Sequence, residues 1–173
     1  MLVTLMHAPL TGFFNNSGSP VIRITVCGVF EQAKQEFDAV LDTGFTGFLS
    51  MPLVQAFPLG LILVGTTSTI LADGSSSPKL MALGRITIGE QTETGIVLLG
   101  GNQRDVLVGM QFLKSFRKTF MLAEGGFLLL DNEDLRKAVE QAHQQLSAQL
   151  PTRNETPAQT PSQPETPSQS LAV

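Results

Sequence analysis

The sequence contains few of the residues that build metal centres, disulfides and aromatic stacking platforms. Among its 173 residues there is one cysteine, Cys27, and there are two histidines, His7 and His143, while tryptophan and tyrosine are absent. A single cysteine cannot form an internal disulfide, and the two histidines lack the spacing of zinc ligands. We therefore expect no disulfide framework, no metal site and no cofactor.

Dense positive charge and long apolar runs are also missing. The net charge is −4, and lysine and arginine form no block of the kind that binds nucleic acid or anionic lipid. No apolar run approaches the roughly 20 residues of a membrane span. Residues 1–14 lack the basic region and the cleavage site of a signal peptide. We expect a cytoplasmic protein without nucleic-acid or membrane partners.

The central part of the chain has the pattern of a mainly β domain. Apolar residues make up 42% of the sequence, which is enough for a core. Alternating, β-branched segments bounded by turn residues predict strands. The predicted strands cover residues 21–26, 34–41, 48–51, 66–71, 80–88, 92–99, 106–109, 118–122 and 127–130. Short helices are predicted after Pro52 and over 110–116, where Phe112, Leu113 and Phe116 share helical spacing.

The composition divides the chain into four parts. Residues 1–19 form an N-terminal arm, either loose or an edge strand, and residues 20–131 form the domain. Residues 132–150 predict a helix with a thin apolar stripe, and the side chain of Asp131 or Asn132 can cap its N-terminus. Residues 151–173 are rich in Pro, Thr, Ser and Gln, cannot bury enough apolar area to fold, and are expected to be disordered.

Asp42-Thr43-Gly44 interrupts the apolar run of residues 39–49. A carboxylate at the end of a buried strand is costly unless donors stabilise it or it shares a proton. The glycine allows a backbone N–H or a substrate to come close, and the threonine hydroxyl can hold neighbouring backbone. The pattern indicates a catalytic aspartate on a tight turn. The same residues also make an ordinary Asx turn between two strands, and both interpretations are open at this point.

A second apolar strand ends in glycine without a carboxylate. It reads Leu107-Val108-Gly109 and is followed by the predicted helix over 110–116, so a strand–glycine–helix unit occurs twice in the chain. Between the two units, Asp73-Gly74 predicts a hairpin turn with a small, polar tip. This hairpin is either a lid over a site or a plain surface hairpin.

Together these features resemble the single-domain, retropepsin-like (clan AA) aspartic proteases over roughly residues 20–130. The phenylalanine that follows Asp-Thr-Gly, Phe45, is similar to the small prokaryotic members with an Asp-Thr-Gly-Phe motif. The resemblance implies a mainly β, closed retropepsin-like barrel (the acid protease fold). A short helix is expected after the second glycine-ended strand, and a further helix at the C-terminal end of the domain.

The resemblance also implies an aspartic endopeptidase that works as a homodimer on a peptide or protein substrate. A two-fold axis beside Asp42 would place this residue against its own copy, and the two carboxylates would share a proton and activate a water. By the resemblance, Thr43 would lock the two loops across the axis, and Gly44 would contact the substrate backbone. Ala72, Asp73 and Gly74 would belong to the flap over the substrate, and the segment Leu107, Val108 and Gly109 would be structural.

Two differences from the retroviral enzymes affect these expectations. Phe45 is bulkier than the small residue that usually follows the motif, and it either narrows the cleft or packs against the core. The retroviral dimer is joined by terminal strands, whereas this domain ends near Leu130 and continues into a helix, so its interface can differ.

Other functions were weighed on the same residues. A dimeric module of this fold could grip extended peptides by strand addition while being slow or inactive as an enzyme. A nucleotide enzyme is poorly supported because the segment Gly65–Ser77 lacks the Gly-Lys-Ser/Thr of a phosphate loop. Catalysis by a Ser/His or Cys/His pair is equally poorly supported, since both histidines lie outside the predicted domain.

Overall fold

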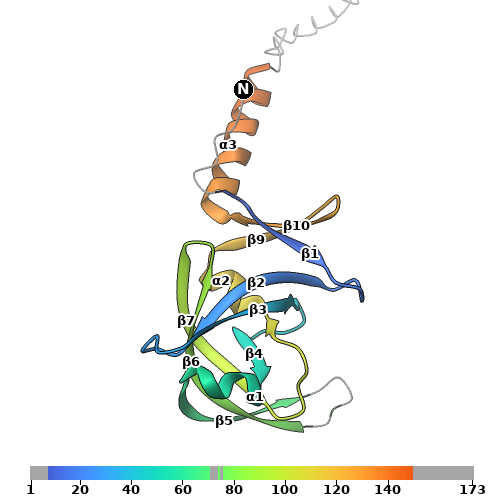
Figure 1. The fold of residues 1–173 in the computed structure, drawn as a ribbon. Helices are drawn as coiled ribbons and strands as arrows, with labels where there is room; N and C mark the ends of the chain where they lie inside the picture. The colour runs from blue at the N-terminus through green and yellow to red at the C-terminus, as the bar shows by residue number, and fades with distance from the viewer. Residues whose placement is uncertain (1–7, 71–73, 75, 150–173) are drawn as a thin grey trace, which may run out of the picture.

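The computed structural model describes residues 8–70, 74 and 76–149. These residues form a mainly β structure (Figure 1). Its strands are β1 (Leu10–Phe14), β2 (Pro20–Cys27), β3 (Lys34–Leu41), β4 (Leu49–Pro52), β5 (Ile62–Ile70), β6 (Ser76–Ile88), β7 (Gln91–Gly100), β8 (Leu107–Val108), β9 (Lys118–Ala123) and β10 (Gly126–Asp131). Its helices are α1 (Leu53–Ala56), the 3-10 helix η1 (Phe57–Leu59), α2 (Met110–Ser115) and α3 (Asn132–Gln149).

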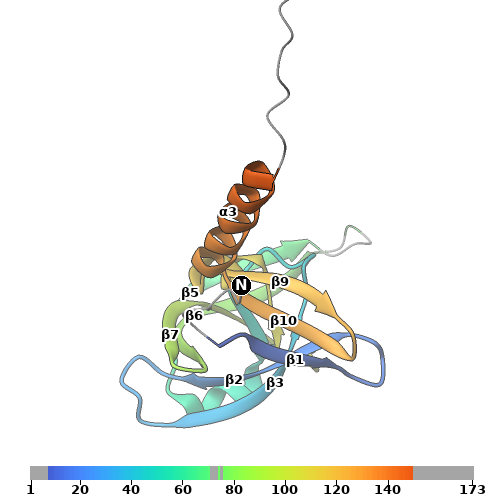
Figure 2. The ribbon, with the colours of Figure 1, turned by 90° about the horizontal axis from the view of Figure 1, so that it is seen from above.

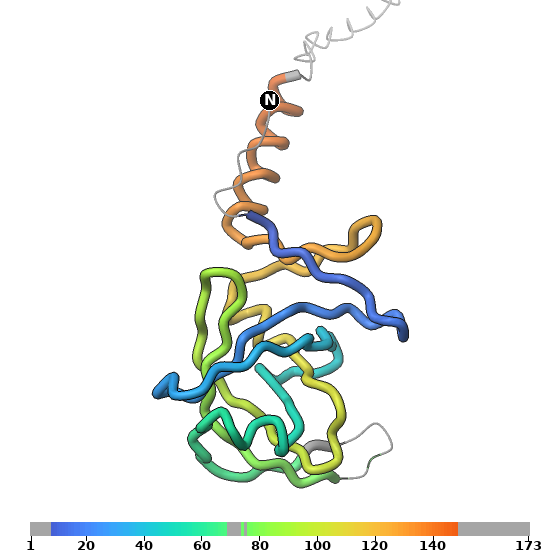
Figure 3. The backbone as a smooth tube through the Cα atoms, in the orientation of Figure 1, coloured from blue at the N-terminus to red at the C-terminus, as the bar shows by residue number. Residues whose placement is uncertain are grey.

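The strands form one strongly curled sheet. Their order is β5-β6-β7-β4-β8-β3-β2-β1-β10-β9, and β6 pairs in addition with β2, so the sheet folds back on itself. The tube in Figure 3 follows this curl. A closed barrel, as the resemblance implies, would require the first and last strands of this order to pair. Within the part of the chain that the structure describes, these end strands are β5 and β9, and they do not pair with each other.

The N-terminal arm differs from the expectation of a loose or edge segment. Strand β1 lies between β2 and β10, with Leu10 opposite Leu129 and Phe13 opposite Val21. Gly12 makes this position possible, because a Cβ atom there would overlap the ring of Phe127. Residues 10–14 of the arm therefore form an interior strand of the sheet, and β10, with which they pair, is far away in the sequence.

The core is built from the inward-facing residues of the curled sheet and from α2. In β3, Phe37, Ala39 and Leu41 alternate with more exposed residues, as the sequence predicts for a half-buried strand. The ring of Phe112 lies 4.7 Å from that of Phe116 and 6.1 Å from that of Phe48 (centroid distances). The helical spacing of the α2 phenylalanines thus places both of them in the core.

The end of the domain is a hairpin, β9–β10, that leads into α3. An ion pair between the buried Lys118 Nζ and Asp131 Oδ2, 3.5 Å apart, joins the open end of the hairpin. The other oxygen of Asp131 accepts the N–H of Glu133 at 3.0 Å, at the start of α3, so Asp131 caps the helix as its sequence position predicts.

Helix α3 extends away from the body of the domain (Figures 1 and 2). In the described ranges, none of the helices combines the length and the apolar character that crossing a membrane requires. Residues 151–173, predicted to be disordered, lie outside the described residues.

Candidate active site

Asp42 directly follows β3, at the start of a tight turn. Its backbone N–H donates to the carbonyl of Val108 (2.9 Å), and its side-chain Oδ1 accepts the N–H of Gly44 (2.9 Å). Asp42 is half-buried, whereas Thr43 and Gly44 are exposed. A Cβ on Gly44 would lie 3.2 Å from this Oδ1, so the glycine allows the close approach of donor and carboxylate. The turn thus presents an oriented carboxylate at the surface of the protomer.

Strand β8 holds the Asp42 turn from behind. It lies between β3, to which it is parallel, and β4, to which it is antiparallel. Leu107 is opposite Val40, and Val108, which is fully buried, is opposite Leu41. The structure therefore places Leu107 and Val108 in the strand that supports Asp42, with no ionisable side chain of their own.

Gly109 is the point at which the two strand–glycine–helix units interlock. A Cβ on Gly109 would overlap the carbonyl oxygen of Phe45 and would lie 2.6 Å from that of Gly47. The next residue, Met110, donates its N–H to the Phe45 carbonyl (2.8 Å), and the N–H of Gln111 reaches the Gly47 carbonyl (3.2 Å). The first turn of α2 thus satisfies its free donors on the loop that follows Asp42.

Phe45 packs against this same backbone. A Cβ on Gly47 would overlap the Phe45 ring, and a Cβ on Gly109 would lie 2.7 Å from it. The ring therefore occupies a cradle formed by two glycines, and it is not among the residues that line the hollow beside Asp42. Of the two roles open to Phe45 from the sequence, this geometry favours packing against the scaffold.

A hollow of about 440 Å³ opens beside Asp42. Most of its wall is apolar and comes from β1, β9 and the strand ends around the aspartate. The lining residues are Phe14, Ser19, Pro20, Val40, Leu41, Asp42, Thr43, Phe120 and Leu122. Asp42 is the one carboxylate among them.

Sequence reasoning did not identify Phe14, Phe120 or Leu122 as site residues. The alternation of the predicted strand 118–122 does place Phe120 and Leu122 on one face. However, only the pairing of β9 with β10, and of β10 with β1, carries that face to Asp42.

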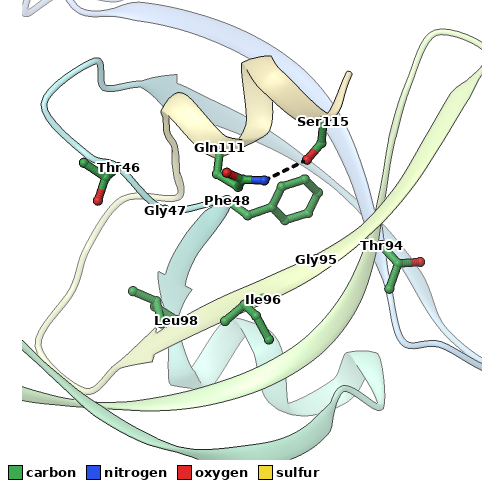
Figure 4. A pocket seen from close by; sticks show the side chains of 9 residues that line it. All are labelled: Thr46, Gly47, Phe48, Thr94, Gly95, Ile96, Leu98, Gln111 and Ser115. Atoms are coloured by element: carbon green, nitrogen blue, oxygen red, sulfur yellow. Dashed lines mark hydrogen bonds between the residues drawn. The ribbon is translucent and has the colours of Figure 1, made fainter. Parts of the chain in front are cut away.

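A second hollow, of about 410 Å³, lies between α2, β7 and the segment after the Asp42 turn. Figure 4 shows its lining, where Gln111 Nε2 donates to Ser115 Oγ at 3.5 Å. Its walls are Thr46, Gly47, Phe48, Thr94, Gly95, Ile96, Leu98, Gln111 and Ser115. No carboxylate, imidazole or thiol is among these residues. The hollow beside Asp42 is therefore the better candidate for acid–base catalysis.

The expected flap residues are only partly described. Ala72 and Asp73 lie outside the described residues. Gly74 is exposed and has φ +81°, a left-handed conformation that favours glycine. Strands β5 and β6, which flank this position, pair antiparallel up to Ile70 and Ser76.

Comparison with known proteins was made on sequence and on structure. No protein-family model and no curated protein sequence matches the chain. Among solved structures, the chain is similar to a retropepsin-like aspartic protease from Rickettsia conorii, with a TM-score of 0.50 and 20% identity over 70% of this chain and 89% of that one. The fold is retropepsin-like.

EIAV protease, solved in complex with the inhibitor HBY-793, is a further match, with a TM-score of 0.47 and 12% identity over 63% of this chain and 98% of that one. The match to the Rickettsia conorii structure confirms the predicted resemblance to retropepsin-like proteases at the level of the fold, and the strands described above confirm the mainly β class. At these identities the likeness concerns the fold, and the assignment of a role to Asp42 depends on the geometry of its turn.

Proposed function

We propose that the chain is an aspartic endopeptidase of the retropepsin-like fold, active as a homodimer in which two copies of Asp42 form the catalytic pair. The observation that carries the proposal is the Asp42 turn: an exposed loop with an oriented carboxylate, held by β8 and opening into a hollow. A plain Asx turn needs neither the interlocking strand nor the adjoining cavity.

The need for a second copy follows from the chemistry. Hydrolysis by carboxylates requires one group to accept a proton and another to donate one. The hollow of one protomer contains a single carboxylate, that of Asp42. A two-fold axis beside the exposed Thr43 and Gly44 supplies the other from the second copy. Two carboxylates at such close range share one proton.

The reaction then proceeds with water as the nucleophile. The ionised carboxylate takes a proton from the water as its oxygen attacks the scissile carbonyl carbon, and the protonated carboxyl gives its proton to the carbonyl oxygen. The tetrahedral intermediate collapses with cleavage of the C–N bond: the carboxyl that took the proton of the water gives it to the leaving nitrogen, and one hydroxyl of the intermediate returns a proton to the other carboxylate. The products are a carboxylic acid and an amine, and the carboxylates are regenerated.

The neighbouring residues have positioning roles in this proposal. The N–H of Gly44 fixes one oxygen of Asp42 and leaves the other for the water. The exposed Thr43 hydroxyl bonds across the two-fold axis to the facing loop. The β5–β6 hairpin, whose turn contains Gly74, acts as the flap over an extended substrate, together with Ala72 and Asp73.

The test is cleavage of a peptide library by the purified protein between about pH 4 and pH 8, the range that a carboxylate pair can span. Asp42→Asn is prepared identically. Cleavage by the wild type alone supports the protease. Binding of extended peptides without cleavage, by a folded dimer, supports instead a peptide-binding module. Equal cleavage by both proteins would contradict the assignment of Asp42.

A further inference from the structure

The two end strands of the sheet differ in how they are protected against pairing with another chain. The outer edge of β5 is interrupted: its register with β6 shifts between Leu63 and Gly65. A bulge of this kind twists an edge away and blocks strand addition. Strand β9 has no such interruption, because it pairs with β10 in unbroken register from Lys118 to Ala123.

The outer half of β9 also lacks the residues that normally protect an edge. From Thr119 to Ala123 it contains no charge and no proline. Met121 and Leu122 are exposed, the latter to 67%. A regular, apolar and unpaired strand edge is a template for pairing with a further strand. In the described part of the chain, no further strand pairs with this edge.

The position of β9 indicates which strand it receives. Phe120 and Leu122 face the hollow that contains Asp42. Met121 faces the opposite side, where it lines an apolar hollow with Leu135 of α3. Because β9 and Asp42 line the same hollow, a second copy that completes the Asp42 pair also comes close to β9.

We propose that β9 is the dimer interface: it pairs antiparallel with β9 of a second copy about a two-fold axis that passes Met121. This inference rests on the proposed homodimeric function and names its interface. An antiparallel strand pair has a two-fold axis normal to the sheet, so identical edges can join isologously. With Met121 opposite its own copy, Phe120 of each chain lies opposite Leu122 of the other and closes the hollow from both sides.

This interface needs no exchange of chain ends. Each protomer keeps its own β1 between β2 and β10. The strands β1, β10 and β9, here called the terminal sheet, are therefore already paired within one protomer before the second copy binds. Pairing of the β9 edges joins the two terminal sheets into one continuous sheet beneath both copies of Asp42.

The first test compares a lysine on each edge. Leu122→Lys and Leu63→Lys introduce the same charge at positions of similar exposure, 67% and 60%. Dimer dissociation constants are measured by analytical ultracentrifugation in the Asp42→Asn background, which prevents self-cleavage. Because an unpaired ammonium is costly to bury, Leu122→Lys should raise the dissociation constant about tenfold or more. Leu63→Lys should leave it unchanged. An unchanged constant for folded Leu122→Lys would overturn the interface.

The second test detects the interface by disulfide cross-linking and does not require the dimer to be weakened. Met121→Cys should form a disulfide-linked dimer under mild oxidation, because the two copies of this residue meet on the axis, whereas Leu63→Cys should not. The native thiol, Cys27, is buried and gives little background. Cross-linking through residue 63 but not 121 would overturn the proposal.

The outcomes separate the interface from the proposed function. Cross-linking at residue 121 without any Asp42-dependent cleavage would retain the β9 interface and reject the protease. Asp42-dependent cleavage together with a dimer that is insensitive to Leu122→Lys would retain the protease and reject the interface.

Discussion

The two glycine-ended strands of this protein, β3 and β8, share a sequence pattern and have different surroundings. The first unit, β3 with Asp42-Thr43-Gly44, ends in a turn whose threonine and glycine are exposed. In the second, β8 with Gly109 and α2, Val108 and Gly109 are buried, and a side chain at the glycine would overlap the carbonyl of Phe45. Gly44 donates its N–H to the Asp42 carboxylate, whereas Gly109 allows two backbone segments to cross at close range.

This comparison shows how one local pattern can serve chemistry in one place and support in another. The carbonyls of the Asp42 loop accept the first N–H groups of α2, so the second unit immobilises the first. A catalytic turn needs such support because a small displacement of the reacting group is costly in rate. The predictions below alter one unit at a time.

The largest effect is expected from Asp42→Asn in the first unit. Loss of the ionisable group should lower cleavage at least about a thousandfold, because proton transfer between carboxylates is removed. The amide oxygen can still accept the N–H of Gly44, so thermal unfolding and dimerisation should change little. Activity on a library-derived peptide is the readout. Isolated mixed dimers with one altered subunit should be inactive as well, and half-activity would contradict a shared site.

Gly109→Ala should be the most damaging change in the second unit. The added methyl group would overlap the backbone of Phe45, and neither strand can yield without breaking hydrogen bonds. We expect a loss of at least about 3 kcal/mol in the free energy of unfolding, measured in urea. Gly101→Ala is the matched control, since no heavy atom lies within 4 Å of its Cβ position. Equal stability of the two variants would mean that the close crossing is not required.

A double-mutant cycle tests whether the ring of Phe45 links the two units. Gly47→Ala alone should destabilise the protein by about 2 kcal/mol, because its methyl group would overlap this ring. In a Phe45→Ala background the same change should cost little, since the overlapping atoms are absent. A coupling energy near 1 to 2 kcal/mol from chemical denaturation is the expected result. Additive effects would show that the ring does not occupy the glycine cradle.

The smallest effect is expected at Thr43, whose hydroxyl the proposed dimer uses across the axis. Thr43→Val should weaken the dimer by about fivefold, the equivalent of roughly 1 kcal/mol for one hydrogen bond. Thr43→Ser keeps the hydroxyl and should stay close to the wild type. Sedimentation equilibrium in the Asp42→Asn background measures both. If both variants dimerise alike, the hydroxyl has no role at the axis.

Much of the fold follows from local patterns. Alternation in residues 34–41 predicts β3, and the spacing of Phe112 and Phe116 predicts which side of α2 is buried. The starts of β5 and β6 were harder to predict: both strands begin earlier than expected, at Ile62 and Ser76. Pairing within the long hairpin extends β6 back through the polar segment 76–79, which has little β propensity of its own, and it pairs β5 from Ile62 onward.

The candidate site was predicted only around its motif. Asp42 and Gly109 stand out because a carboxylate or a glycine ends an apolar strand. Phe14, Phe120 and Leu122 carry no such signal, since apolar residues in strands are ordinary. Their place beside Asp42 arises from the order β1-β10-β9, which joins segments at opposite ends of the domain.

The sequence by itself determined which groups are available for chemistry: one carboxylate in an Asp-Thr-Gly turn, a second glycine-ended strand, and no cysteine pair. It also determined the strand periodicity, because alternation is a local property of a few residues. The tertiary structure decided that β8 inserts between β3 and β4, that β1 becomes an interior strand, and that the apolar edge of β9 lies beside Asp42. Strand order depends on pairing between distant segments, and a local pattern does not specify its distant partner.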